Sequence, residues 1–434
     1  MTPRNMARLG GLALSTVLMA GVAAPAFAGS FYLQEQSARG MGRANSGETA
    51  DKGVESLWFN AASIARSGRQ VTTSLHAIRL DAEANNNGSY VTYTNPANGQ
   101  QYTAPVMNAR QTEEPLENGL VPNFAIATPV TDRLAVGLVV AAPYNFTTKY
   151  SPESFARYDA GTSELRSADL GLTAAYQVND WLDIGAGVNV EYVKAKLTSA
   201  MPAFAPTFAD GSNRLEGDGF AYGWNVGAQV HHGKWDLGLS YRSAIEHELE
   251  GEIETVLTGP LAPNSFSADG GASINTPWFA SAAVRYAVTD KLTLNAQVNR
   301  IGWSEFDAIR VSYPGGGDVI HQNYEDVTTG AIGLDYAMSD KTTLRAGVAY
   351  DPTPTTDELR TARIPDADRT LYSVGLRTDV TEGVVFDAAV TYIGMNKSEM
   401  HDDRSFYNGL VTSHLRGDIE GSGLVFSMGT TIQF

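Results

Sequence analysis

The stretch VTDRLAVG, residues 130–137, places a polar knot, Thr131-Asp132-Arg133, before apolar residues that alternate with small ones. Similar phrases return as VNDWLDIG from Val178, HHGKWDLG from His231, VTDKLTLN from Val288, MSDKTTLR from Met338 and VTEGVVFD from Val380. Period-2 alternation is typical of strands, and a short polar knot between two such runs is typical of a hairpin turn. The six phrases therefore predict six hairpins in an all-β protein.

The alternation between the turns indicates where these strands lie. In residues 182–192 one face is apolar, whereas the other carries Asp183, Gly185, Gly187, Asn189 and Glu191. Strands of about ten residues with an apolar outer face and a polar or small inner face are typical of a transmembrane β-barrel. A soluble sandwich with its apolar face inward would show the same alternation, and this stays the alternative.

Counting the alternating runs predicts fourteen strands, an even number as in bacterial single-chain barrels. They begin near residues 70, 121, 134, 168, 182, 220, 234, 273, 291, 324, 341, 369, 384 and 422. The expected fold is an all-β, 14-stranded antiparallel transmembrane β-barrel over residues 70–434. The six short turns face the periplasm, and the longer connections face outward.

The N-terminus and the composition indicate export. Residues 1–28 resemble a signal peptide, with Arg4 and Arg8, an apolar run, and Ala26-Phe27-Ala28 as the cleavage site; an uncleaved membrane anchor is the alternative. The chain has 434 residues, no cysteine and a formal net charge of −17. Disulfides are therefore excluded, and nucleic acid is a poor partner for so acidic a protein.

Residues 29–69 show no strand alternation, yet they contain Leu57, Trp58, Phe59 and Ile64. Such a segment is too apolar for a solvated tail. We expect it to plug the barrel, which then is not an open water channel.

This segment resembles the N-terminal hatch of the FadL-type outer-membrane transporters of long-chain fatty acids and aromatic hydrocarbons. The resemblance rests on GMGRANSGE from Gly40, with Gly42 and Arg43, and on Asn60-Ala61-Ala62, where the family has Asn-Pro-Ala. It extends to Tyr350-Asp351-Pro352-Thr353-Pro354 and Arg363-Ile364-Pro365-Asp366-Ala367-Asp368-Arg369 in a late loop. It implies a Gram-negative outer-membrane barrel in contact with membrane lipids and lipopolysaccharide. The terminal Phe434 implies recognition by the barrel assembly machinery.

Two loops expected to face outward, 199–211 and 255–268, are unusually apolar. Exposed apolar patches mark binding surfaces. We expect a capture groove for acyl chains there, although the same side chains could simply cap the barrel. The residues are Met201, Phe204, Phe208, Val256, Leu257, Leu261 and Phe266.

The resemblance also implies a deeper site reached by Phe31, with a residue that only fixes the hatch as the alternative, and a lateral opening where strand 3 is kinked. Pro143 is the expected cause of the kink, since proline cannot donate to a ladder. The alternative is that the barrel-spanning part of the strand simply ends there.

The strand phase turns four possible carboxylate partners inward: Arg242, Arg285, Arg345 and Arg377. Asp183, Glu191, Asp236 and Asp387 also point inward, and because inward charges in a narrow lumen usually pair with each other, structural ion pairs are the alternative for each arginine. The arginine that some family members carry falls at Ser199, so acidic and neutral cargo both remain open.

The sequence offers no enzyme motif: HExxH, GxSxG and the P-loop are all missing. We expect no cofactor and no metal site. The leading hypothesis is a passive outer-membrane transporter for hydrophobic molecules, most of all long-chain fatty acids. An aromatic-hydrocarbon channel of the same family is the main alternative, followed by a barrel phospholipase and a general porin or adhesin.

Overall fold

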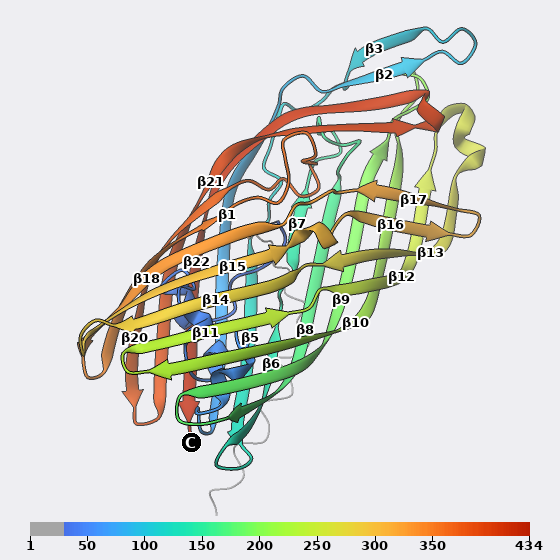
Figure 1. Ribbon diagram of the computed structural model, residues 1–434. Helices are drawn as coiled ribbons and strands as arrows, with labels where there is room; N and C mark the ends of the chain where they lie inside the picture. Colours follow the sequence, from blue (N-terminus) through green and yellow to red (C-terminus); the bar gives the residue numbers. More distant parts are fainter. Residues whose placement is uncertain (1–29) are drawn as a thin grey trace, which may run out of the picture.

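A computed structural model describes residues 30–434; the predicted signal peptide, residues 1–28, lies outside the described residues. The chain forms one antiparallel sheet that closes on itself (Figure 1). Closure occurs where β1 (Gln70–Asn86) pairs on one side with β5 (Gly119–Pro129) and on the other with β22 (Val411–Gln433). The barrel expected from the sequence is thus confirmed. Its wall has fourteen strands, which we call staves because three of them consist of two consecutive shorter strands.

The remaining staves follow in chain order. They are β6 (Leu134–Ala141) continued by β7 (Asn145–Lys149), β8 (Thr162–Gln177), β9 (Leu182–Met201), β10 (Gly211–His232), β11 (Trp235–Arg242) continued by β12 (Ile245–Val256), β13 (Phe266–Thr276) continued by β14 (Trp278–Ala287), β15 (Leu292–Gly302), β18 (Val327–Ser339), β19 (Thr342–Asp351), β20 (Arg369–Thr381) and β21 (Val384–Phe406).

Smaller elements complete the chain. Short strands at the long-loop end are β2 (Tyr90–Thr94), β3 (Gln101–Pro105), β4 (Thr112–Glu113), β16 (Ala308–Tyr313) and β17 (Gly316–His321). The helices are α1 (Ala38–Met41) and the 3-10 turns η1 (Glu48–Ala50), η2 (Val54–Ser56), η3 (Ala61–Ile64), η4 (Gly259–Asn264), η5 (Trp303–Glu305) and η6 (Tyr407–Gly409). Within residues 30–434, none of the helices could cross a bilayer.

The repeated polar knots form the short turns, and in three of them the side chain of the second residue accepts two backbone amides. The hydroxyl of Thr131 accepts hydrogen bonds from the amides of Arg133 and Leu134. The side chain of Asn179 and the hydroxyl of Thr289 accept the equivalent pairs. Two tighter turns use Gly233 and Gly383 at φ 60° and 76°, where a side chain would be strained.

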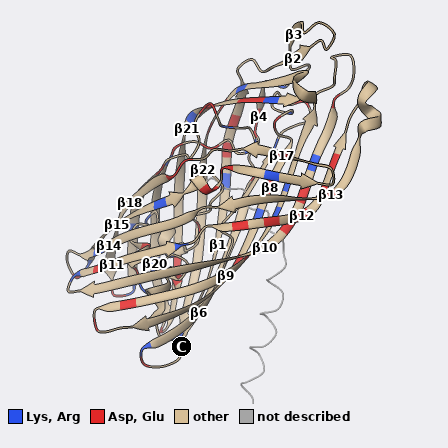
Figure 2. Ribbon diagram, turned by 45° about the vertical axis from the view of Figure 1, so that its right-hand side comes forward, with Lys and Arg blue, Asp and Glu red and all other residues tan. Residues whose placement is uncertain are grey.

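The side-chain pattern reverses along the wall. Near the middle of the barrel, large apolar side chains such as Leu172, Val188 and Trp224 point outward and are exposed. At the long-loop end, β12 instead exposes Glu246, Glu248, Glu250, Glu252 and Glu254, and the acidic run is visible in Figure 2. Its alternate residues Ile245, Leu249 and Ile253 are buried. The strands therefore rise beyond the bilayer and enclose an apolar interior there.

The N-terminal segment, residues 30–69, lies inside the barrel (Figure 1). It contacts staves on opposite sides of the lumen, since α1 touches β20, β21 and β22 whereas η3 touches β8, β9 and β10. Glycines on the wall make room for it. A β-carbon at Gly347 would lie 2.1 Å from the carbonyl oxygen of Arg43, and one at Gly238 would lie 2.1 Å from that of Thr49.

Candidate functional site

The third stave is interrupted at Pro143. The ladder of β6 ends at Ala141 and β7 begins at Asn145, so residues 142–144 leave the sheet. On the other side of the break, β5 pairs with β6 only from Phe124 to Pro129, although β5 starts at Gly119. Because proline has no amide hydrogen, the expected interruption at Pro143 has a direct physical cause.

The start of the N-terminal segment covers this break and bonds to both of its edges. The amide of Leu33 donates to the carbonyl of Pro143 at 2.7 Å, and the amide of Asn145 donates to that of Phe31 at 3.3 Å. Across the break, the side-chain amide of Asn123 donates to the carbonyl of Glu35 at 2.9 Å. Residues 31–35 therefore take the place of the strand pairing that is missing where the third stave is interrupted.

Phe31 is 1% exposed and lies at the centre of an aromatic cluster. Its ring centroid is 4.8 Å from that of Trp303, 5.0 Å from Phe306, 5.8 Å from Tyr144 and 6.0 Å from Phe146. The contacts with Trp303, Phe306 and Tyr144 are edge-on, which is a favourable arrangement for aromatic rings.

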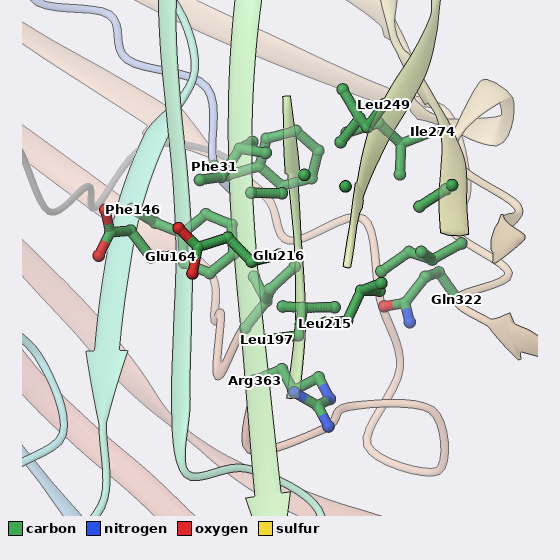
Figure 3. A pocket seen from close by; sticks show the side chains of 18 of the residues that line it. Phe31, Phe146, Glu164, Leu197, Leu215, Glu216, Leu249, Ile274, Gln322 and Arg363 are labelled. Carbon is green, nitrogen blue, oxygen red and sulfur yellow. The ribbon is translucent and has the colours of Figure 1, made fainter. Parts of the chain in front are cut away.

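An apolar cavity opens beside this cluster at the long-loop end (Figure 3). Apolar residues of β8, β9, β10, β12 and β13 line it, among them Leu165, Leu197, Leu215, Leu249 and Ile274, and Phe31 also contributes to the lining. The free volume is about 40 Å³, which suits a few water molecules. A long acyl chain would fit only after lining side chains move.

The late loop, between β19 and β20, forms hydrogen bonds with the start of the N-terminal segment. A carboxylate oxygen of Asp366 accepts the amide of Ser30 at 3.0 Å, and one of Asp351 accepts the side-chain amide of Gln34 at 2.8 Å. Arg369, itself buried, donates to Asp351 at 2.6 Å. The two late-loop motifs of the sequence are thus brought together around the start of the segment.

The glycine-rich motif packs against the wall. Gly42 approaches the α-carbon of Gly375, since a β-carbon on Gly42 would lie 3.2 Å from it. Gly40 faces its own turn, where a β-carbon would lie 2.4 Å from the side-chain oxygen of Asn45. A side chain at Gly40 would have to displace the side chain of Asn45, and one at Gly42 would be tight against the backbone of Arg39 and Gly375.

Asn60 caps η3 and anchors it to the wall. Its side-chain oxygen accepts the amide of Ala62 at 2.9 Å, and its nitrogen donates to the carbonyl of Thr49 at 2.7 Å and to two carbonyls of the wall. Ala61 occupies the first position of η3, a place where proline is also favourable. The helical turn therefore starts without the proline that the family has there.

A buried ion network joins the N-terminal segment to the wall. Arg43 is fully buried, and its guanidinium lies 2.5 Å from Glu48, 2.6 Å from Asp51 and 3.1 Å from Asp335 of β18. Ten side chains share the network, five cations and five carboxylates, so it is neutral. They are Arg39, Arg43, Arg285, Arg345, Arg377, Glu48, Asp51, Glu55, Asp335 and Asp387.

The four arginines expected as ligand partners all point inward, but each of them already interacts with other groups of the protein. Arg285, Arg345 and Arg377 belong to the ion network. Arg242 stacks on Trp58, with its guanidinium carbon 3.7 Å from the ring centroid, and donates to the Trp58 carbonyl. Their inward phase could be read from the strands, whereas their partners lie on other elements.

The apolar loop residues lie together at the long-loop end, but their three aromatic rings pack against different partners. Phe204 packs edge-on against Tyr407. Phe208 lies against Gly259, where a β-carbon would meet its ring at 2.8 Å. Phe266 packs against Tyr313. Met201 and Val256 end β9 and β12, Leu257 follows β12, and Leu261 lies in η4. None of the seven lines the apolar cavity.

Of the residues that line the cavity, sequence reasoning predicted only Phe31 and missed, among others, Phe146, Phe306 and Arg363. Phe146 lies three positions after Pro143, where a strand break re-aims side chains, and this signal could have been used. Arg363 was part of a recognised motif but had no assigned role. Within residues 30–434, no group of three or more His, Asp or Glu side chains is placed to hold a metal ion.

The last residues form the outer face of β22. Leu424, Phe426, Met428, Ile432 and Phe434 are all exposed. The amide of Phe434 donates to the carbonyl of Arg69, so the end of the chain is fixed at the start of the first stave. Recognition of Phe434 by an assembly machinery stays a prediction.

Comparison with known proteins agrees with this architecture. Residues 19–434 match the family described as "Outer membrane protein transport protein (OMPP1/FadL/TodX)". The chain is 26% identical over 410 residues to the long-chain fatty acid transport protein of Salmonella typhi, covering 87% of this chain and 90% of the relative. It is 25% identical over 413 residues to outer membrane protein P1 of Haemophilus influenzae, covering 88% and 89%.

Solved structures share the fold. A crystal structure of a Pseudomonas aeruginosa FadL homologue has a TM-score of 0.79 at 23% identity, covering 93% of this chain and all of that one. The toluene transporter TodX of Pseudomonas putida has a TM-score of 0.67 at 14% identity, covering 94% and 100%. The family match spans nearly the whole sequence, and the barrel and its closure agree with it. The chain therefore belongs to the OMPP1/FadL/TodX family, whose members are outer-membrane transporters of hydrophobic molecules and not enzymes.

Proposed function

We propose that this chain takes up hydrophobic molecules, long-chain fatty acids above all, by passive movement from its outward loops to an opening in the wall at Pro143. The observation that carries the proposal is the double role of residues 31–33. Phe31 lines the apolar cavity, and its own carbonyl and the amide of Leu33 form hydrogen bonds to the break in the third stave. A ligand that displaces Phe31 would therefore also loosen the cover of the opening.

The N-terminal segment would act as a hatch in this scheme. A lumen filled by the segment does not suit free diffusion of ions, as a general porin requires. Movement of its first five residues would be enough to connect the cavity with the break, while the ion network keeps the rest in place. Burial of each methylene contributes about 0.8 kcal/mol, so an acyl chain supplies its own driving force.

A cross-link tests the gate. Tyr32 and Tyr144 form an isolated antiparallel bridge, and the hydrogen bonds flanking it belong to residues 31, 33, 143 and 145. The two residues are thus a non-hydrogen-bonded pair, whose α-carbons lie close enough for a disulfide. The chain has no cysteine, so Tyr32→Cys with Tyr144→Cys would form a single bond. We expect oxidation to stop fatty-acid uptake by cells that lack their own transporter, and reduction to restore it.

The single variant Tyr32→Cys, treated with the same oxidant, is the control and should keep its uptake. The reduced double variant shows whether losing the rings of Tyr32 and Tyr144 changes uptake without any cross-link. Undiminished uptake by a fully cross-linked protein would show that cargo does not need this movement.

The cargo class is tested in the same cells. Long-chain fatty acids and small aromatic hydrocarbons are offered separately. An aromatic cargo is a second candidate because the four rings around Phe31 could also accommodate a planar molecule. Uptake of fatty acids alone supports the first proposal, uptake of aromatics alone supports the second, and uptake of neither contradicts both.

The apolar loop residues are the proposed capture surface. Their exposure supports this role, since Phe208, Val256 and Phe266 all present large apolar area to solvent. Capture would precede transfer to the cavity, which the same strands β9, β10, β12 and β13 enclose below the loops.

A further inference from the structure

The turn phrase HHGKWDLG places two histidines at the periplasmic rim of the barrel, and the proposed transport uses neither of them. His231 is level with the short turns, since its amide donates to the carbonyl of Trp181 in the turn between β8 and β9. The side chain of His231 is only 12% exposed, whereas His232, on the opposite face of the strand, is exposed. His231 is therefore a largely buried titratable group outside the apolar band of the wall.

Both ring nitrogens of His231 face carboxylates from the neighbouring strands. Nδ1 lies 2.6 Å from Oδ1 of Asp236 on β11, and Nε2 lies 3.0 Å from Oδ2 of Asp183 on β9. An ionised carboxylate only accepts hydrogen bonds, and a neutral imidazole has a single N–H to donate. Both contacts are therefore hydrogen bonds only when the ring carries two protons and a positive charge.

The same two carboxylate oxygens hold the N-terminal segment. Oδ2 of Asp183 also lies 2.6 Å from Nε of Arg66, and Oδ1 of Asp236 lies 2.9 Å from Nζ of Lys52. Lys52 precedes η2 and Arg66 follows η3, so the two pairs fix both ends of the stretch that contains these helical turns. His231 joins the two pairs into one continuous set of contacts across β9, β10 and β11.

The charges around His231 favour its protonated form. The nearest ones are Asp183, Asp236 and Lys52. Arg285 of β14 is the cross-strand neighbour of Asp236, but its guanidinium pairs with two carboxylates of the ion network. Burial lowers the pKa of His231, but its hydrogen bonds to the two aspartates outweigh this effect, so the pKa is raised from its ordinary value of 6.5.

We propose that His231 is a positioning residue for the N-terminal segment, and that its second proton controls how firmly residues 52–66 are held at the periplasmic end of the barrel. When the ring loses that proton, one nitrogen presents a lone pair to an ionised carboxylate. The carboxylate must then move away, and it takes its partner in the segment, Arg66 or Lys52, with it.

The sign of the pH dependence follows from the raised pKa. The held arrangement keeps a proton that a freely solvated histidine would lose near pH 6.5. Its stabilisation is therefore fully present below pH 6.5 and is lost as pH rises through the raised value. This effect concerns residues 52–66, which are distinct from residues 31–35 over the break, and it holds for any class of cargo.

The test is maleimide labelling of Ala65→Cys in the purified full chain, because Ala65 is 9% exposed and directly precedes Arg66. Asn98→Cys, at an exposed position, serves as the reference for thiol ionisation. We expect the corrected rate to rise by about tenfold between pH 5.5 and pH 8.5, because loss of one hydrogen bond to a charged group shifts an equilibrium by about this factor.

Three variants in the Ala65→Cys background separate the proton from the ring. His231→Gln has no titratable group, so it should label fast at every pH. His231→Lys keeps a cation between the two carboxylates, so it should label slowly over the same range. His232→Gln is the matched control and should keep the wild-type profile.

A flat wild-type profile would overturn the proposal, and so would a profile of His231→Gln that rises as that of the wild type does. A rise in His231→Lys equal to that of the wild type would overturn it as well. This last comparison keeps the test decisive if His231→Gln fails to fold.

Discussion

Glu35 affects how stably residues 31–35 bind over the break in the third stave. It lies in the part of the segment that bonds to Asn123, is buried, and has a carboxylate oxygen without a hydrogen-bond partner among the described residues. Burial raises the pKa of Glu35 to about 7, against the attraction of Arg369 that lowers it. The neutral acid is therefore the form that the folded protein favours.

This shift predicts a pH dependence. The carboxyl group of Glu35 loses its proton near pH 4.5 when the segment is unfolded, but keeps it up to about pH 7 when the segment is folded over the break. The seated state thus binds more protons between these values, and its stability falls as pH rises through them. Glu35→Gln should remove this fall and stabilise the seated segment above pH 7 by about 1–3 kcal/mol. The measurement is the rate at which a maleimide labels Tyr32→Cys between pH 5 and pH 8.

Labelling of an exposed reference, Asn98→Cys, corrects for thiol ionisation. We expect the corrected rate to rise with pH in the Tyr32→Cys background and to stay flat when Glu35→Gln is added. Parallel curves for the two proteins would contradict the role of Glu35.

At the scale of elements, the seating of the N-terminal segment depends on close backbone approach and on charge pairing. Both arise because α1 and η1 lie against strands that present glycine or an opposite charge at the contact. Each contribution can be removed without changing the staves themselves, since the ladders between strands do not involve these side chains.

Gly347→Val tests the close approach. The β-carbon would lie 2.1 Å from the carbonyl oxygen of Arg43, so α1 must leave the wall. We expect the barrel to fold and its ion conductance in a planar bilayer to rise. Gly330→Val on the neighbouring strand is the matched control, because a β-carbon there meets no atom within 4 Å. Equal conductance of the two variants would mean that the segment tolerates the displacement.

Asp335→Asn tests the charge pairing. Asp335 lies within 3.3 Å of Arg43, Arg285 and Arg345. Its loss leaves buried cations uncompensated, for which we expect a destabilisation of about 3–5 kcal/mol.

Thermal unfolding in detergent, followed by circular dichroism, would measure the effect of Asp335→Asn. Asp307→Asn, which breaks the exposed pair with Arg310, should change stability by less than about 0.5 kcal/mol. Similar shifts for both variants would show that the network does not hold the segment.

For the whole molecule, the reversal of polarity along the wall divides the barrel into two zones. The lower zone is apolar outside and holds the N-terminal segment, whereas the upper zone is acidic outside and encloses the apolar cavity. A hydrophobic ligand would therefore meet the loops first, then the cavity, and then the break in the wall.

The proposed capture surface can be tested at this scale. Phe208→Asp with Leu257→Asp places two charges on facing loops, and we expect fatty-acid uptake at low ligand concentration to fall several-fold. Uptake at high concentration should change less, because ligand can then reach the cavity directly. Val319→Asp on β17 adds a charge at the same end outside the loop pair. Equal effects of both changes would argue against a dedicated capture surface.

Local patterns in the sequence were enough to predict the strand number, the six turns, the small inner face and an N-terminal segment inside the barrel. These properties depend on residues a few positions apart, so a period of two and a polar knot reveal them. The inward phase of Arg242, Arg285, Arg345 and Arg377 was predictable for the same reason. Recognition of Pro143 as a break needed only its missing amide hydrogen.

Tertiary structure decided the rest. Which arginines are neutralised depends on carboxylates from other elements, such as Asp335, 292 positions from Arg43. Closure of the barrel brings these residues together, and no local period encodes that pairing. The same closure places Arg363 of a late loop beside Ser163, Thr198 and the carboxylate of Asp159. The sequence by itself thus determined the barrel and its family, and only the closed fold decided which charged side chains pair inside it.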